Sequence, residues 1–354
     1  MKQFFEKFNI EDKVVVAAVS GGADSLALAL RLKESGKKVV ALTVDHGLRP
    51  ESAAEALYVS QVMSANGIEH HILEWTGHKP EKGIEEAARQ ARYRLMFDFC
   101  KANRIGVLAT GHHLRDQAET FLLRLQRGSG VFGLSGILPV SERNGIILIR
   151  PQLSDSPEAL RQYLSAKHIK WVEDPMNQDE DFARVKIRHF LPELERIGID
   201  AQCLADTAAT LLKTRLFLSE TADKFIESRV RFFDKVAACL SWQRLKALPQ
   251  EIAMIVLGQL IKKIGAGEYS PESAEMLRVL EKADDFKGCT LGKCELFIAS
   301  KRLWIVPQDE DSILMSRQEW ENFCKTHQEY LSAGLPYKVR RALRNKTEKQ
   351  YGEG

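Results

Sequence analysis

The sequence has few cysteines, no long apolar run and no apolar segment at its start. Its six cysteines are scattered over 354 residues and form no C-x-x-C pair, which argues against a zinc knuckle or a redox pair. The apolar runs are too short to cross a bilayer. Residues 1–13 carry charges throughout and do not resemble a secretory signal. We therefore expect a cytoplasmic protein with reduced thiols and no membrane partner.

Strand-like and helix-like segments alternate in the first half of the chain. β-branched and apolar runs predict strands at 14–19, 39–44, 70–75, 105–110 and 146–149. Amphipathic segments predict helices at 25–35, 51–66, 84–103 and 115–127. This alternation predicts an α/β fold with a doubly wound, mainly parallel sheet that helices cover on both sides.

The pattern changes after about residue 198. Helices are predicted at 204–225 and 249–264, and a strand pair at 294–298 and 303–306. From residue 309 onward the chain is polar and ends in a basic patch, which suits either phosphate contacts or a disordered tail. We therefore expect an α/β domain, a mostly helical second domain and a polar, basic tail, with the bounds 1–198, 199–308 and 309–354.

A tight glycine turn joins the first predicted strand to the first long helix. Its sequence is Ser20-Gly21-Gly22-Ala23-Asp24-Ser25. Backbone N–H groups at a helix start are unpaired and attract anions, and glycines let the backbone approach such an anion closely. Asp24 offers a carboxylate that could hold Mg²⁺ beside a polyphosphate. The spacing differs from that of a Walker A loop, so the turn predicts a phosphate site of another kind.

Two histidines and a glycine follow the ends of other predicted strands. His46 follows the second strand, and Gly111 and His112 follow the fourth. Ligands of parallel sheets bind at the carboxyl ends of the strands. We therefore expect these residues in the same cleft as the glycine turn.

The polar run at 110–120 is the second strong motif. If a helix opens at Asp116, then Asp116 and Glu119 share one face of it, and two carboxylates at a cleft edge suit Mg²⁺ or a cationic substrate. A transition-metal site on His112, His113 and Asp116 is an alternative, although adjacent histidines diverge unless the backbone bends. A helix N-cap with acids in its first turn would explain Asp116 alone.

Two groups of basic residues each allow two interpretations. Arg89 and Arg92 lie one turn apart, which taken alone is typical of a solvated stripe on a helix. Basic residues at 184, 186, 188 and 189 follow an acidic loop. They could neutralise a polyphosphate or a nucleic acid backbone, or form a solvated face.

Taken together, these motifs resemble those of the tRNA(Ile)-lysidine synthetases, a family of PP-loop ATP pyrophosphatases. The matching segments are Ser20–Ser25, Asp45–Arg49, Glu85–Tyr93, Thr110–Thr120, Arg127–Gly136, Arg150-Pro151 and Trp171–Arg188. The resemblance implies a Rossmann-like PP-loop domain and a ligase that uses ATP and Mg²⁺. It also implies L-lysine and a CAU-anticodon tRNA(Ile) as the other substrates. It leaves the oligomeric state open, and a homodimer is the assembly that we consider.

The resemblance implies a reaction in two steps. ATP would first adenylate the carbonyl at C2 of the wobble cytidine, which releases pyrophosphate. The amine of lysine would then attack C2 and expel AMP, leaving lysidine. The modified anticodon would read AUA in place of AUG, and the tRNA would change its identity from methionine to isoleucine.

The resemblance also assigns roles to residues. The ATP site would consist of Ser20, Gly21, Gly22, Ala23, Asp24, Ser25, His46, Gly111 and His112, with Mg²⁺ on Asp24. Lysine would be bound by Asp116, Glu119 and Asp174. The residues expected to act on the reacting groups are Asp24, Asp116, Arg184 and Arg188, where either arginine would balance negative charge on the phosphate.

Four positions depart from the family pattern. Gly83, Arg115, Met176 and Val185 stand where the family more often has asparagine, an acidic or polar residue, serine and asparagine. Two alternatives remain open, namely another PP-loop tRNA-modifying enzyme such as a 2-thiolase, and an inactive tRNA-binding homologue. A thiolase usually needs paired C-x-x-C motifs, which this sequence lacks. The intact loop with Asp24 argues against the inactive homologue.

Overall fold

The computed structural model describes residues 1–47, 51–77, 79–80, 83–173, 183–233, 236–265, 270–284, 286–308, 325 and 335–343. The chain divides into two compact units, Met1–Lys213 and Thr214–Gly354. The dividing point lies inside a long helix, α9 (Ala201–Arg229), whereas the sequence pattern placed it before this helix. The assignment of separate functions to the two parts and the tail stays a prediction.

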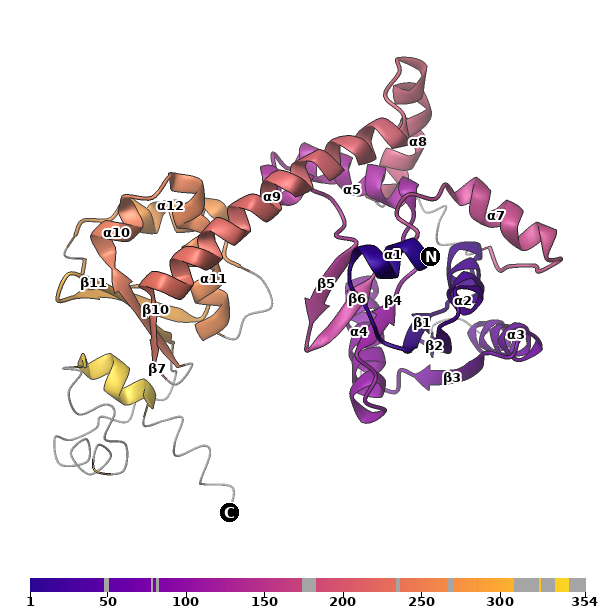
Figure 1. The fold of residues 1–354 in the computed structure, drawn as a ribbon, viewed down its shortest axis with the longest axis horizontal. Helices are drawn as coiled ribbons and strands as arrows, with labels where there is room; N and C mark the ends of the chain where they lie inside the picture. Colours follow the sequence, from indigo (N-terminus) through magenta and orange to yellow (C-terminus); the bar gives the residue numbers. More distant parts are fainter. Residues whose placement is uncertain are drawn as a thin grey trace. The chain divides into compact units, whose positions relative to one another are not determined.

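The first unit is built on a six-stranded sheet with the order β3-β2-β1-β4-β6-β5 (Figure 1). Its strands are β1 (Val14–Ala18), β2 (Lys38–Asp45), β3 (Glu69–Glu74), β4 (Val107–Ala109), β5 (Val140–Arg143) and β6 (Ile146–Ile149). All neighbours pair in parallel except β5, which runs antiparallel to β6. The predicted doubly wound, mainly parallel sheet is confirmed. The short, polar β5 was not predicted because its sequence has no apolar run.

Helices cover both faces of this sheet. One face packs against α1 (Lys2–Lys7), α2 (Ala23–Glu34), α3 (Ser52–Ala65) and α7 (Pro157–Ala166). The other face packs against α4 (Ile84–Ala102). The sequence of the central strand β1 explains why both faces of the sheet are covered. Val15 and Val16 point to opposite faces, and both are fully buried.

The direction in which strands are added reverses beside β1. The chain proceeds from β1 through β2 to β3, and then returns to β4 on the other side of β1. Ligands of doubly wound sheets bind at the carboxyl ends of the strands at such a switch point. The segments that follow β1 and β4 are the glycine turn and the start of the polar run at 110–120. The topology therefore brings the two strongest sequence motifs together.

A helical cluster beside the sheet carries the polar run. α5 (Leu114–Gln126) packs against α8 (Ala183–Arg196) and the start of α9 through Phe121, Leu191 and Leu204. The short helix α6 (Val131–Leu134) also contacts α5. This packing fixes the acidic face of α5 relative to the basic residues of α8.

The second unit combines helices with a five-stranded antiparallel sheet, ordered β7-β8-β11-β10-β9. Its strands are β7 (Arg231–Phe233), β8 (Ala237–Ser241), β9 (Cys289–Leu291), β10 (Cys294–Ala299) and β11 (Arg302–Pro307). Its further helices are α10 (Trp242–Lys246), α11 (Gln250–Ile264) and α12 (Ser273–Leu280). One face of the sheet packs on α11 and the other on residues 335–343.

The predicted strand pair is confirmed as the hairpin of β10 and β11. Ser300 and Lys301 form its turn and both have positive φ angles, as a tight two-residue hairpin turn requires. β7, β8 and β9 were not predicted, because strands of three to five residues are too short to show an alternating pattern.

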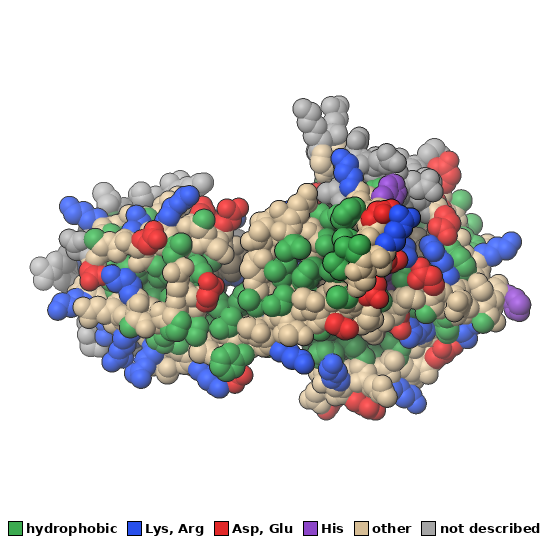
Figure 2. All heavy atoms as spheres, turned by 90° about the horizontal axis from the view of Figure 1, so that it is seen from above, with side chains coloured by type: hydrophobic (Ala, Val, Ile, Leu, Met, Phe, Trp, Pro, Cys, Tyr) green, Lys and Arg blue, Asp and Glu red, His purple; other side chains and the backbone are tan. Residues whose placement is uncertain are grey.

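The surface of the second unit carries many basic side chains. Figure 2 shows Lys and Arg side chains gathered on it, toward the lower left of the view.

None of the helices in the described ranges combines the length and the hydropathy that a membrane-spanning segment needs.

Candidate active site

The glycine turn leads from β1 into α2, as the sequence predicts. Gly21 has a φ angle of +91°, a conformation that glycine adopts without strain. Gly22 is the N-cap residue of α2, and no side chain of a described residue caps this end of the helix. The N–H groups of the first turn of α2 are therefore open to an anion, and the helix dipole adds partial positive charge.

The two serines of the turn have different surroundings. Ser25 Oγ accepts a hydrogen bond from Ser20 N at 3.1 Å and donates one to Gly22 O at 2.9 Å. Ser25 is buried, whereas Ser20 is exposed. Ser25 thus holds the turn closed, and Ser20 presents the hydroxyl that a ligand can reach.

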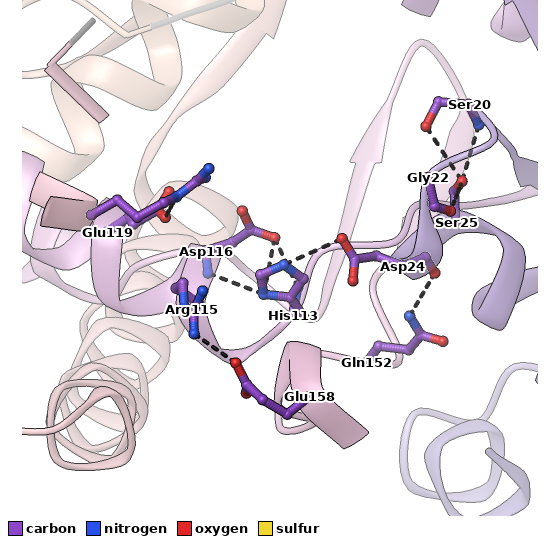
Figure 3. A network of polar contacts seen from close by, with 11 residues as sticks. Ser20, Gly22, Asp24, Ser25, His113, Arg115, Asp116, Glu119, Gln152 and Glu158 are labelled. Atoms are coloured by element: carbon purple, nitrogen blue, oxygen red, sulfur yellow. Dashed lines mark hydrogen bonds and ion pairs between the residues drawn. The ribbon is translucent and has the colours of Figure 1, made fainter. Parts of the chain in front are cut away.

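His113 is the N-cap residue of α5 and lies beside the glycine turn (Figure 3). Its Nδ1 accepts from the N–H of Asp116 at 3.4 Å, and its own N–H donates to Asp116 Oδ2 at 3.0 Å. Its Nε2 lies 3.4 Å from Oδ2 of Asp24. Burial alone would lower the pKa of His113, but the hydrogen bond to Asp24 and the nearby carboxylates outweigh it and raise this pKa.

Asp116 and Glu119 lie one turn apart on α5, as predicted, but in different surroundings. Asp116 belongs to the capping box and keeps 17% of its side chain exposed. Glu119 is 0% exposed, and its Oε1 accepts from Arg188 Nε at 2.8 Å. Its Oε2 is buried without a hydrogen-bond partner among the described residues. The structure thus joins Glu119 to Arg188, two residues that the sequence analysis placed in separate roles.

His112 faces a different set of groups from His113. Its Nδ1 lies 2.9 Å from Thr110 Oγ1. The pKa of His112 is lowered to about 4, chiefly by burial and also by the charges of Arg150, Arg89 and Arg184, against the opposing charge of Asp116. His112 is therefore neutral at neutral pH and lies in a positively charged environment.

His46 lies at the carboxyl end of β2, as predicted. Its ring packs edge-on against Trp75, with the ring centres 5.8 Å apart, and its Nδ1 is buried without a hydrogen-bond partner among the described residues. Burial lowers the pKa of His46, and the charge of Arg92 adds to this effect. His46 is therefore a neutral, half-buried side chain.

Two contacts hold the backbone of Asp24. The side chain of Gln152, which is 0% exposed, donates from Nε2 to the main-chain oxygen of Asp24 at 3.0 Å (Figure 3). Gly111 lies so close that a Cβ at this position would be 3.1 Å from the carbonyl carbon of Asp24. The ends of β4 and β6 therefore fix the first turn of α2.

Comparisons with known proteins agree with this fold. The model of the PP-loop domain family matches residues 1–194. A tRNA(Ile)-lysidine synthase of Ruegeria pomeroyi is 37% identical over 293 residues, which is 81% of this chain and 69% of that protein. A tRNA(Ile)-lysidine synthase of Methylobacterium nodulans is 40% identical over 307 residues, which is 83% of this chain and 90% of that protein. The chain belongs to the tRNA(Ile)-lysidine synthase family.

A similar solved structure supports the fold alone. It is the U34-tRNA thiolase NcsA from Methanococcus maripaludis with its 4Fe-4S cluster. The two share a TM-score of 0.51 at 17% sequence identity, covering 60% of this chain and 78% of that chain. The PP-loop fold that the sequence motifs implied is confirmed.

The expectations about Asp174 and about a transition-metal site are not supported by the described residues. Asp174, expected at the lysine site, lies outside the described residues. Over the described ranges, no group of three or more His, Cys, Asp or Glu side chains could hold a metal ion. His112 and His113 contact different partners, so the alternative of a transition-metal site on these histidines has no support.

The arginines of α4 are not a uniformly solvated stripe. Arg89 is exposed, but Arg92 is partly buried, and burial lowers its pKa. Both guanidinium groups, together with that of Arg143, lie between 5 and 6 Å from the ring centre of Tyr93. The tertiary packing of α4, which periodicity does not reveal, explains the difference.

Sequence reasoning did not find the roles of His113, Gln117 and Gln152. For His113 a signal exists, because an acidic residue three positions after a cap residue is the pattern of a capping box. Gln117 bonds both the N–H and the C=O of Ile137, at 2.6 and 3.1 Å. Gln152 and its partner Asp24 are 128 residues apart, so no local pattern could have linked them.

Proposed function

We propose that the chain ligates L-lysine to the wobble cytidine of tRNA(Ile) with a CAU anticodon. The C2 oxygen of cytidine attacks the α-phosphorus of ATP, and pyrophosphate leaves. The amine of lysine then attacks C2, the C2–O bond breaks, AMP leaves with that oxygen, and the amine loses a proton. The product is lysidine. Membership in the tRNA(Ile)-lysidine synthase family supports this proposal.

The observation that carries the proposal is the carboxylate of Glu119. This side chain is fully buried, and its Oε2 has no hydrogen-bond partner among the described residues. A buried anion with an unused acceptor favours a cationic donor, and the ammonium group of lysine is such a donor. Asp116, one turn earlier on α5, would add a second carboxylate. Asp174 completes the proposed lysine site only as a sequence-based expectation.

The glycine turn is proposed to bind the pyrophosphate part of ATP. The uncapped start of α2 offers N–H groups, and Ser20 offers a hydroxyl. Asp24 fits Mg²⁺, because its carboxylate is 37% exposed and Mg²⁺ is commonly held by one or two carboxylates together with substrate phosphates. Bound there, Mg²⁺ would supply positive charge that neutralises the phosphates and favours release of pyrophosphate.

One arginine of α8 is proposed to balance charge on the α-phosphate. Arg184 is exposed on α8 and acts electrostatically on His112. Arg188, one turn further along, is already paired with Glu119. We therefore assign the phosphate role to Arg184 in preference to Arg188, which we expect to orient Glu119. His46, at the end of β2, would form part of the wall for the nucleoside.

The second unit is proposed to hold the tRNA. Its basic surface suits a phosphate backbone. Lys338 and Arg341 in the described part of the basic segment both face Glu295, so part of this charge stabilises the unit itself. A homodimer and a cytoplasmic location stay predictions.

The experiment combines purified protein, ATP, Mg²⁺, L-lysine and a CAU-anticodon tRNA(Ile) transcript. The expected result is lysine-dependent release of AMP and a cytidine nucleoside heavier by the mass of lysine less water. Parallel reactions omit lysine or use tRNA(Met). A separate reaction contains sulfide in place of lysine, and incorporation of sulfur into the tRNA there would identify a thiolase. Absence of ATP turnover with all substrates present would favour an inactive homologue.

A further inference from the structure

The ring of His113 lies between two carboxylates that the proposed function gives to different substrates. Its Nε2 is 3.4 Å from Oδ2 of Asp24, which is assigned to ATP (Figure 3). Its Nδ1 is 3.6 Å from Oδ2 of Asp116, which is assigned to lysine, and 3.4 Å from the backbone nitrogen of the same residue. The ring is buried, with 8% of the residue exposed. A single side chain therefore contacts both proposed half-sites.

Although nearby carboxylates raise the pKa of His113, the hydrogen bond from the N–H of Asp116 to Nδ1 requires an Nδ1 without a proton. One tautomer of the neutral ring then satisfies both contacts. Nδ1 can accept from the N–H of Asp116 only when it carries no proton, which places the ring proton on Nε2, facing Asp24. The other tautomer would lose the bond at each end. Both distances are long for hydrogen bonds, and such contacts commonly tighten when substrates bind.

The backbone of Asp24 is held independently of His113. Gln152 donates to its main-chain oxygen, and Gly111 packs against its carbonyl group. The Asp24 carboxylate itself makes no hydrogen bond or ion pair with a described residue other than His113. The position of Asp24 is therefore fixed by the fold, while the direction of its carboxylate depends on His113.

We propose that His113 is a positioning residue that serves both steps through its two ring nitrogens. Nε2–H orients the Asp24 carboxylate for adenylation, and Nδ1 fixes the first turn of α5, and with it Asp116, for lysine binding. This inference rests on the proposed function. Neither the resemblance nor the sequence pattern assigns this role to His113.

Two substitutions separate the two contacts. Asparagine places its amide oxygen where histidine has Nδ1, and it is a good N-cap residue. His113→Asn therefore keeps the start of α5 and loses the contact with Asp24. Glutamine reaches as far as Nε2, so His113→Gln keeps a donor for Asp24 and loses the cap.

The two variants should affect different steps. His113→Asn should slow pyrophosphate release in reactions with ATP and tRNA but no lysine by about 10- to 100-fold, the usual cost of removing such a supporting contact. Its KM for lysine should stay within about twofold of the wild type. His113→Gln should keep pyrophosphate release within about threefold and raise the KM for lysine about tenfold.

Controls separate this role from a purely structural one. His71→Asn and His71→Gln, at a partly exposed histidine of β3, should leave both steps unchanged. Thermal unfolding of every variant and calorimetric binding of lysine provide readouts that do not depend on turnover. Equal losses of both steps in both His113 variants, or no loss in either, would overturn the proposal. The wild-type reaction is run in parallel, so failure of the proposed function itself would appear there as absence of lysidine.

Discussion

Arg188 donates from Nε to Oε1 of Glu119 at 2.8 Å, and the second oxygen of this buried carboxylate has no hydrogen-bond partner among the residues that the structure describes. Glu119 is 0% exposed, whereas Arg188 keeps 33% of its side chain exposed. An incompletely satisfied buried charge costs free energy. The fold tolerates this cost at the position where a cationic substrate is proposed to bind.

Replacing Glu119 tests the lysine site. Glu119→Gln keeps the shape of the side chain and removes its charge, so it should raise the KM for lysine about 10- to 100-fold, the range expected for loss of a charged hydrogen bond. The KM for ATP should change much less. Steady-state kinetics with each substrate varied measures both values. Glu193→Gln, at an exposed position of α8, is the matched control. Equal effects on lysine and ATP would move Glu119 to the metal site.

Replacing Arg188 tests the burial of its partner. Arg188→Met leaves the charge of Glu119 buried and unpaired, which should lower the free energy of unfolding by about 3 kcal/mol. Urea denaturation of the whole chain measures this change. Arg196→Met removes an exposed pair with Glu193 on the same helix and should cost less than about 1 kcal/mol. Similar losses in the two variants would show that Glu119 is solvated in solution.

Replacing Asp24 tests the glycine turn. Asp24→Ala should abolish pyrophosphate release, because the phosphates lose the carboxylate that is proposed to hold their Mg²⁺. The affinity for tRNA, measured by filter binding, should stay close to that of the wild type. Asp98→Ala, at an exposed position of α4, should leave both unchanged. A loss of tRNA affinity in Asp24→Ala would contradict the assignment of this residue to ATP.

Replacing Gln152 tests the contact that ties β6 to α2. Gln152→Leu has a similar volume but cannot donate to the main-chain oxygen of Asp24. We expect the KM for ATP to rise about three- to tenfold, while the free energy of unfolding changes by about 1 kcal/mol, the usual value of one such hydrogen bond. Kinetics and urea denaturation measure the two effects. Gln90→Leu, at an exposed position of α4, is the control. An unchanged KM for ATP would mean that the fold holds Asp24 without Gln152.

The lowered pKa of His112 makes stability depend on pH. Burial holds this pKa at about 4 in the folded chain, against about 6.5 when unfolded. Between these values the unfolded chain binds the extra proton, so stability falls as the pH drops below about 6.5. The loss should reach about 2 kcal/mol between pH 7.5 and pH 5. Urea denaturation at both pH values should show a smaller acid loss in His112→Gln than in the wild type. His189→Gln, at an exposed position, should behave as the wild type does.

Local patterns explain what the sequence predicts well. The run at 14–19 predicts a buried strand, and the glycines after it predict the turn, because both signals lie within a few residues of each other. The same holds for the shared face of Asp116 and Glu119 on α5. Ligands of doubly wound sheets bind at the carboxyl ends of the strands beside a switch point. These motifs could therefore be placed in one site before any side-chain contact was known.

Contacts between distant segments explain what the sequence did not predict. Arg188 is 69 residues from Glu119, and their pairing depends on how α8 packs against α5. Arg92 has the spacing of a solvated residue, yet the packing of α4 partly buries it beside Tyr93. The three short strands of the second unit gain their stability from neighbours in the sheet and not from their own sequence.

The hydrogen bond from Gln152 to the main-chain oxygen of Asp24 affects the stage of synthesis at which the site can form. The glycine turn is synthesised before β6, so the main-chain oxygen of Asp24 gains its hydrogen bond from Gln152 only after a further 128 residues have been made. His113, which orients Asp24, also emerges long after the turn. A nascent chain that ends before residue 152 therefore carries the glycine turn without one of the side chains that contact Asp24, and we expect the proposed ATP site to form only after β6 has been made.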